Sequence, residues 1–259
     1  MPMSVLAWPG AVAIGVSLGL LGSGGSILTV PVLVYLVGQD EKVAIAGSLF
    51  VVGLIALAGG LQYIRQQLID WQKVFVFGLP GMAGTYLGAV IAAYVPGIVQ
   101  LALFAVVMLL ASVMMLRPID LAAAAGRPAR AYWKIAVDGL GVGVLTGLVG
   151  VGGGFLIVPA LVLLGGMGMH RAVATSLIII ALKSFSGFYK YLDVLDAQNL
   201  ALDWPVLGIV TALGIAGSVV GGKIANRLPQ DTLKRWFAIF LILMGLYILA
   251  RSAPAALGF

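Results

Sequence analysis

Leu20-Leu-Gly-Ser-Gly-Gly-Ser-Ile-Leu-Thr-Val-Pro31 is a glycine cluster followed by a short apolar run that ends in proline. The pattern returns 128 residues later as Leu148-Val-Gly-Val-Gly-Gly-Gly-Phe-Leu-Ile-Val-Pro159. Each glycine inside a helix costs about 1 kcal/mol relative to alanine, so three or four together break the helix. We therefore expect two matched helix breaks in a duplicated chain.

The duplication extends well beyond the glycine clusters. The first offset holds through the middle of each half, and after a five-residue insertion it becomes 133. Matched pairs are Gly15 with Gly143, Ser48 with Ser176, Tyr63 with Tyr191, Asp70-Trp71 with Asp203-Trp204, and Pro96 with Pro229. We predict an N-terminal repeat at 1–117, a linker at 118–133 and a C-terminal repeat at 134–259.

The composition places these repeats in a membrane. Of 259 residues, 62% are hydrophobic and 9% are charged, whereas charged residues make up about 25% of a soluble domain. Most apolar segments approach the roughly 20 residues that a spanning helix needs, but 26–38 and 155–167 are too short. The predicted fold is an all-α polytopic membrane protein, in which each repeat has one glycine-broken helical hairpin and three transmembrane helices. Soluble enzyme classes are excluded.

The basic residues indicate how the repeats are oriented. If each broken segment enters the membrane and returns, the linker and most basic residues lie in the cytoplasm, as the positive-inside rule requires. The cytoplasmic set is then Arg65, Lys73, Arg117, Arg127, Arg130, Lys134, Arg171, Lys223, Arg227, Lys234 and Arg235. Only Lys42 and Arg251 lie outside. We therefore predict inverted repeats, with both termini outside.

The glycine clusters are the first candidate binding site. A helix that begins after a break carries unpaired N–H groups and a partial positive charge, which together bind anions. Broken backbone survives inside a bilayer only when protein or a wet cavity surrounds it. Close helix packing is the alternative explanation. The candidate residues are Gly22, Ser23, Gly24, Gly25, Ser26, Gly150, Gly152, Gly153 and Gly154.

Lys183 is the second candidate. It lies twelve residues after Arg171, which is about 18 Å along a helix. A lysine at that depth is costly, and such residues tend to line a transport pathway. An internal ion pair with Asp138 is the alternative. The repeat-equivalent residue is Ile55, so the charge is not part of the duplicated scaffold.

Hydroxyl groups supply further candidates. Ser48, Thr175 and Ser176 precede the middle of the span that carries Lys183 or its equivalent. Their hydroxyls are expected to bind substrate oxygens or, alternatively, their own helix backbone. With no cysteine and one histidine, we expect no catalytic residue, metal or cofactor. An intramembrane serine protease built on Ser23 and His170 is disfavoured, because the two residues are predicted at opposite membrane faces.

These motifs resemble the TauE/SafE family of sulfite and organosulfonate exporters. The resemblance is carried by Gly25 and Gly153, each six residues before a proline, by 147–161 and by Ala174-Thr-Ser176. It covers nearly the whole chain and implies a bacterial inner-membrane permease for small sulfur-containing anions. The first copy departs from the pattern, with Ser26 where the second copy has Gly154, so the two half-sites are expected to differ.

We therefore predict export of a small anion, sulfite or a short organosulfonate such as sulfoacetate. Alternating access would come from the two repeats rocking about the glycine-broken helix ends and Lys183. The expected partners are the anionic substrate and the lipid bilayer, with a homodimer left open and no nucleic acid. An anion channel remains the main alternative, and the transport direction, coupling ion and substrate are not determined by the sequence.

The first prediction concerns topology. Residues 193–203 and both termini should face the periplasm, whereas 117–134 and 223–235 should face the cytoplasm. Single cysteines at Asp196 and Asp231 can be labelled with a membrane-impermeant reagent, because the chain has no native cysteine. Position 196 should react in intact cells, and position 231 only after the membrane is opened. The reverse pattern would rule out inverted repeats.

Overall fold

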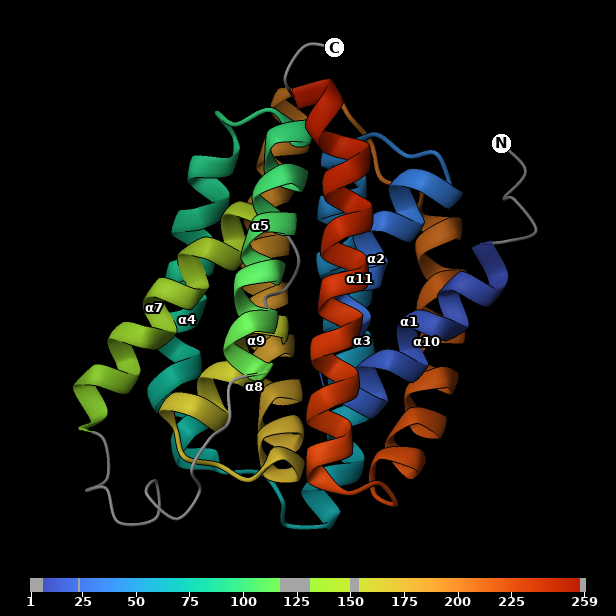
Figure 1. Cartoon of the computed structure of the whole chain (residues 1–259). Helices are drawn as coiled ribbons and strands as arrows, with labels where there is room; N and C mark the ends of the chain where they lie inside the picture. The colour runs from blue at the N-terminus through green and yellow to red at the C-terminus, as the bar shows by residue number, and fades with distance from the viewer. Residues whose placement is uncertain (1–6, 23, 117–130, 150–153, 257–259) are drawn as a thin grey trace.

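The computed structural model describes residues 7–22, 24–116, 131–149 and 154–256. Within these ranges every regular element is a helix, which confirms the predicted all-α class. Figure 1 shows the helices gathered in one bundle. The elements are α1 (Ala7–Leu21), α2 (Gly24–Pro31), η1 (Val32–Leu36), α3 (Glu41–Arg65), α4 (Trp71–Ala92), α5 (Gly97–Leu116), α7 (Tyr132–Val149), α8 (Gly154–Pro159), η2 (Ala160–Leu164), α9 (Met169–Ala197), α10 (Trp204–Ala225) and α11 (Gln230–Ala256).

Five helices in the described part of the chain are long and apolar enough to cross a membrane, namely α3, α4, α7, α9 and α10. The predicted count was six, with three in each repeat. The prediction counted α5 and α11 as spans and took α7 as one arm of the second hairpin. With 18 residues, α7 is long enough to cross the membrane. In α5 and α11, the structure describes the side chains of shorter apolar stretches, Gly97–Val113 and Arg235–Ala250. The multi-pass character predicted from composition is confirmed.

Large apolar side chains are exposed on the outer faces of several helices. Phe75 on α4 is 56% exposed, Leu110 on α5 is 61% exposed and Leu243 on α11 is 60% exposed. Water around such a surface would be unfavourable, whereas lipid tails are as apolar as these side chains. The outer faces of these helices are therefore suited to contact the bilayer.

The first glycine cluster forms a helical hairpin. Gly22 adopts a φ of +72°, a left-handed conformation that ends α1 and reverses the chain. Beyond the turn, Gly25 lies against Leu18, and near the open end Gly10 lies against Val32. The arm α1 therefore runs antiparallel to α2 and η1, as the hairpin interpretation requires.

Both short arms change their helical form immediately after proline. Pro31 is followed by the π-helix η1, and Pro159 by the π-helix η2. A bond from Val37 N to Val32 O, of 3.0 Å, closes η1, and the equivalent bond closes η2. Because proline has no N–H and crowds the preceding turn, it disturbs the helical hydrogen-bond pattern at these points.

The repeat-equivalent helices α3 and α9 cross antiparallel. The contacts that show their direction are Leu49 with Gly187, Gly53 with Ser184, and Gly60 with Ile178. The centre of this crossing falls near Ile55 and Lys183, which are themselves equivalent. Figure 1 also shows α1 and α7, which are equivalent too, beginning at opposite ends of the bundle. The orientation of the repeats in a bilayer stays a prediction.

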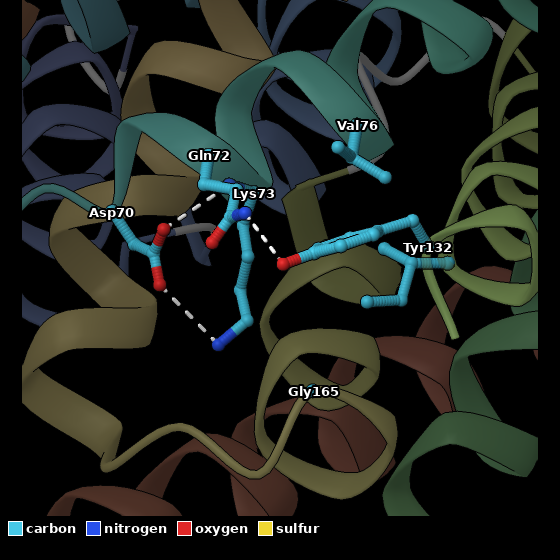
Figure 2. A pocket seen from close by; sticks show the side chains of 7 residues that line it. Asp70, Gln72, Lys73, Val76, Tyr132 and Gly165 are labelled. Carbon is cyan, nitrogen blue, oxygen red and sulfur yellow. Dashed lines mark hydrogen bonds and ion pairs between the residues drawn. The ribbon is translucent and has the colours of Figure 1, made fainter. Parts of the chain in front are cut away.

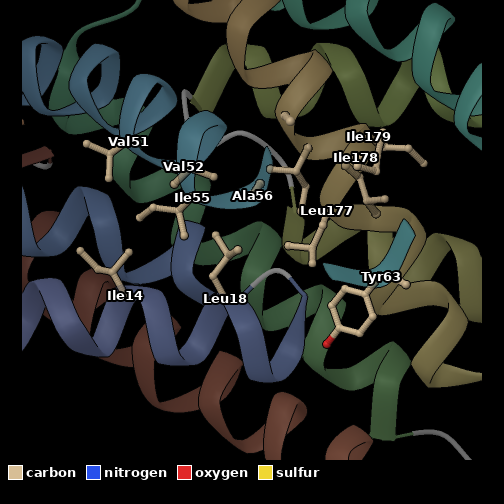
Figure 3. Close-up of a cluster of buried hydrophobic side chains, with 14 of the residues drawn as sticks. Ile14, Leu18, Val51, Val52, Ile55, Ala56, Tyr63, Leu177, Ile178 and Ile179 are labelled. Carbon is tan, nitrogen blue, oxygen red and sulfur yellow. The ribbon is translucent and has the colours of Figure 1, made fainter. Parts of the chain in front are cut away.

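The core lies along the α3–α9 crossing and under the first hairpin. Figure 3 shows Ile14 and Leu18 of α1 below Ile55 of α3, with Leu177 of α9 beside them. All four side chains are fully buried. Each buried side chain of this kind contributes roughly 1.5–3 kcal/mol when it is removed from water, although lipid weakens that gain, so shape complementarity carries more of the stability here.

Glycine allows two pairs of helices to touch through their backbones. On α4 and α7, a Cβ atom added to Gly84 would meet the backbone of Gly143, and a Cβ atom on Gly143 would meet the backbone of Gly81. The equivalent pair α1 and α10 meets in the same way at Gly15 and Gly214. These contacts agree with the small-residue pattern of membrane helix interfaces.

A basic residue caps the C-terminal end of each equivalent helix α4 and α10. Lys42 Nζ donates to the carbonyl oxygens of Ala92 and Val95, at 2.5 and 2.6 Å. Its repeat equivalent, His170, places Nε2 3.1 Å from the carbonyl oxygen of Ala225. The last carbonyls of a helix lack intrahelical donors and carry partial negative charge. This contact explains a lysine on the side predicted to be poor in basic residues.

The α4–α7 contact predicts opposite effects of one substitution at two glycines. Gly143→Ala should lower the free energy of unfolding by about 1–3 kcal/mol, because the new methyl group meets the Gly81 carbonyl. Gly141→Ala is the matched control, since nothing lies within 4 Å of its Cβ position. The control should raise stability by up to about 1 kcal/mol. Thermal unfolding in detergent measures both, and equal effects would contradict the interface.

Candidate functional site

Lys183 lies at the midpoint of α9, Met169–Ala197, and its side chain is fully buried. It faces α4, where Gly81 leaves room for the aliphatic chain. A Cβ atom at Gly81 would lie 3.1 Å from Lys183 Cδ and 3.3 Å from the carbonyl oxygen of Gly139. The lysine therefore occupies a narrow space between α9, α4 and α7 that glycine makes possible.

The Lys183 ammonium group has an aromatic neighbour but no hydrogen-bond partner within the described ranges. Nζ lies 5.8 Å from the centre of the Phe77 ring, close enough for a cation–π contact. No hydrogen bond reaches Nζ in the described chain, and no ion pair joins it to Asp138. A buried charge without such partners is unfavourable unless a ligand or water supplies them.

The side chain of Lys183 points toward the beginning of α4. Its Cδ lies beside Gly81, whereas Nζ lies beside Phe77, which is one helical turn closer to the start of α4. Lysine side chains on a helix lean toward its N-terminal end. The contacts along α4 and α9 thus place the positive charge nearer the start of both helices than the backbone of Lys183 is.

Among the hydroxyl candidates, Ser176 meets the first glycine cluster. Its Oγ lies 3.3 Å from the carbonyl oxygen of Gly22 and 2.8 Å from that of Val173. The contact crosses from α9 to the hairpin tip. Because Lys183 follows Ser176 by seven residues, the backbones of the two residues lie about 10 Å apart along the helix. The predicted site residues therefore form two groups, separated by two turns of α9.

The other two hydroxyls serve the scaffold. Ser48 Oγ donates to the carbonyl oxygen of Ile45, at 2.8 Å, within its own helix. Thr175 Oγ1 accepts the Asp70 N–H at 3.0 Å, and the Asp70 carboxylate in turn caps the start of α4. For Ser48 the backbone alternative describes the observed contact, and Thr175 ties α9 to the turn that precedes α4.

Parts of both glycine clusters lie within the described chain. Gly24 begins α2, Ser26 is fully buried, and a Cβ atom on Gly25 would collide with α1. Gly154 begins α8, and α8 contacts α2. The two short arms therefore meet inside the bundle. Gly150, Gly152, Gly153 and Ser23 lie outside the described residues.

A pocket that the sequence did not reveal opens between α4, α7 and η2. Figure 2 shows its lining side chains near the start of α4. The pocket has a volume of about 170 Å³. Lys73 Nζ lies 3.3 Å from the Asp70 carboxylate, and Gln72 Nε2 donates to the Tyr132 hydroxyl at 2.7 Å. In the sequence Lys73 served only as a topology marker. The other side of the pocket, formed by Tyr132, Ile135 and Gly165, is far away along the chain, so no local pattern could identify the pocket.

Among the possible metal ligands and catalytic groups that the structure describes are acidic residues and the single histidine, His170, which has a defined contact. The described residues contain no group of three or more histidine, aspartate or glutamate side chains that could hold a metal ion. His170 is engaged with the end of α10 through Ala225.

Comparison with known proteins agrees with this architecture. The profile of the family described as sulfite exporter TauE/SafE matches residues 7–248. The chain belongs to this family. It is 31% identical over 246 residues to a probable membrane transporter protein of Xylella fastidiosa, covering 92% of each chain.

More distant relatives in this family carry similar names. The probable membrane transporter protein YunE of Bacillus subtilis is 30% identical over 250 residues, covering 87% of this chain and 90% of its own. One from Methanocaldococcus jannaschii is 25% identical over 260 residues, covering 95% and 96%. No solved structure matches the chain. The chain is therefore a multi-pass membrane protein of a transporter family.

The surroundings of Lys183 predict how its removal affects stability. Lys183→Met removes a buried charge and keeps most of the volume, so the free energy of unfolding should rise by about 1–3 kcal/mol. Thermal unfolding in detergent without added anion measures the change. If an ion pair with Asp138 held the fold instead, Lys183→Met would be destabilised and Asp138→Asn would restore stability.

Proposed function

We propose that this protein is a permease that exports a small sulfur-containing anion, sulfite or a short organosulfonate such as sulfoacetate, across the bacterial inner membrane. The observation that carries the proposal is the fully buried Lys183 at the midpoint of α9, without a hydrogen-bond partner among the described residues. Intramembrane ionisable residues mark substrate pathways. An oxyanion would supply the missing acceptor oxygens.

The two hairpins supply the second part of the binding site. In the proposal, α2 and α8 present the N–H groups of their first turns toward the anion. Contact between α2 and α8, and between Ser176 and Gly22, supports convergence of the arms on one interior region. Ser176 lies at this contact, whereas Ser48 and Thr175 are proposed as substrate contacts from the sequence alone.

Alternating access follows from the proposed relation between the repeats. We propose that 1–117 and 134–259 are inverted repeats joined by a cytoplasmic linker at 118–133, with both termini in the periplasm. The antiparallel crossing of α3 and α9 supports this, because equivalent helices that cross antiparallel are related by an axis perpendicular to them. Rocking about such an axis opens the site to each side in turn. A homodimer is compatible with this scheme.

Anion binding by purified protein tests the proposal. Sulfite, sulfoacetate and methanesulfonate should bind with saturation, whereas a cation such as choline should not. Lys183→Met should weaken binding about tenfold to hundredfold, the equivalent of roughly 1.5–3 kcal/mol for a charged hydrogen bond. Saturable flux in proteoliposomes separates a permease from a channel. Flux that rises linearly with concentration would favour the anion channel.

Valine at a hairpin tip gives an independent test of the same site. Gly24→Val and Gly153→Val should abolish binding while the protein stays folded, because a branched side chain blocks approach to the helix N-terminus. Gly141→Val is the control, since its Cβ position is open. Full binding by both tip variants would mean that the clusters only allow close packing.

A further inference from the structure

The pocket at the start of α4 lies directly below the Lys183 site. Val76 and Ile135 line the pocket, and each is followed closely by a residue of the Lys183 surroundings. Val76 precedes Phe77, whose ring faces Nζ, and Ile135 is one helical turn before Gly139. Pocket and lysine thus lie at successive levels along α4 and α7.

Phe77 lies between these two levels on α4, one helical turn after Lys73 of the pocket and one turn before Gly81. It is 2% exposed, and its backbone meets Gly139 of α7, so α4 and α7 are in contact on its far side. Lys183 extends toward Phe77 rather than away from it. The charge therefore points at the pocket, with an aromatic ring next to it.

The other repeat holds aliphatic side chains at the equivalent positions. The counterparts of Lys73, Phe77 and Lys183 are Val206, Val210 and Ile55, all buried in one apolar cluster. Ile55 packs against Gly214 as Lys183 packs against Gly81. The equivalent positions are therefore all aliphatic in one copy, whereas the other copy has lysine at two of them, and Phe77 at the third belongs to the same apolar cluster.

The pocket has donors suited to transit of an anion. Lys73, Gln72 and Tyr132 place an ammonium, an amide and a hydroxyl group around it. The Asp70 carboxylate, 3.3 Å from Lys73 Nζ, offsets that positive charge. A nearly neutral, polar pocket favours passage over tight retention, whereas the buried Lys183 charge attracts an anion strongly.

We propose that this pocket is the cytoplasmic antechamber of the Lys183 site, that it takes small oxyanions, and that Phe77 is the gate residue between them. The gate rests on the proposed transport function, and it adds the route by which the anion reaches the lysine. A sulfonate or sulfite passing Lys73 must displace the Phe77 ring before it meets Nζ.

Thiol labelling measures the route without requiring transport. Lys183→Cys supplies the single cysteine of the chain, and the probe is 2-sulfonatoethyl methanethiosulfonate, a small anion that reacts with thiols. Labelling of purified protein should be slow with Phe77 present and about tenfold faster with Phe77→Ala, because thiol exchange rates follow access. Phe77→Leu should lie between the two and serves if the alanine variant does not fold.

Two matched variants make the test specific. Phe75→Ala, an exposed phenylalanine on the same helix, should leave the labelling rate unchanged. Val76→Trp, which fills the pocket, should slow labelling again in the Phe77→Ala background. An unchanged rate in Phe77→Ala and Phe77→Leu, or no slowing by Val76→Trp, would overturn the gate. Failure of wild-type protein to bind anions would instead contradict the proposed function, and labelling still decides the route.

Discussion

Backbone-to-backbone contact between helices is the constraint on which this structure depends. Lipid gives no hydrophobic drive for helices to associate, so close packing and polar contacts must hold them together. Glycine faces on α1 with α10, and on α4 with α7, let carbonyl groups approach Cα atoms directly. The arm α1 has 15 residues, too few to span alone, and α10 holds it in place. The broken backbone at Gly22 is thereby buried in protein rather than lipid.

The sequence predicted those elements whose cause is local. Glycine and proline act within a few residues, so the first hairpin, its short return arm and the duplication were all visible before the structure. The change to π-helix after Pro31 could not be predicted. Proline shows that the helical hydrogen-bond pattern is disturbed, but not which pattern follows it. The role of Lys42 was missed because its acceptors, Ala92 and Val95, are about fifty residues away.

In the candidate site, too, features with a local cause were predicted and features that depend on distant residues were not. Depth along α9 predicted a buried Lys183 from spacing alone, and the serine matched by the repeat, Ser176, does touch the hairpin at Gly22. The two-turn separation between them, and the neighbours Phe77 and Gly81, follow from the rotation of α9 against α4. One chain without its packing partners does not determine that rotation. Thr175 illustrates the limit, since its partner Asp70 is 105 residues distant.

Duplication also explains how the protein tolerates an unfavourable residue. The same helix contact occurs twice, at Gly81 with Lys183 and at Gly214 with Ile55. In the copy with Gly214, the fully buried Ile55 is an ordinary core residue. That copy contributes packing, while the copy with Lys183 carries the desolvation cost of a charge. In the proposed permease, packing at Ile55 and substrate recognition at Lys183 thus belong to different halves of one scaffold.

The π turns that follow Pro31 and Pro159 have a mechanical consequence. A π turn holds one residue more than an α turn and keeps its backbone hydrogen bonds, here from Val37 N to Val32 O and from Gly165 N to Ala160 O. Exchange of one turn type for the other shifts the chain beyond it by a single residue, about 1.5 Å. The arm that follows each glycine cluster thus contains one residue more than an α-helix of the same length would need. We expect that this extra residue lets the start of the arm shift along its axis while the helix keeps its hydrogen bonds.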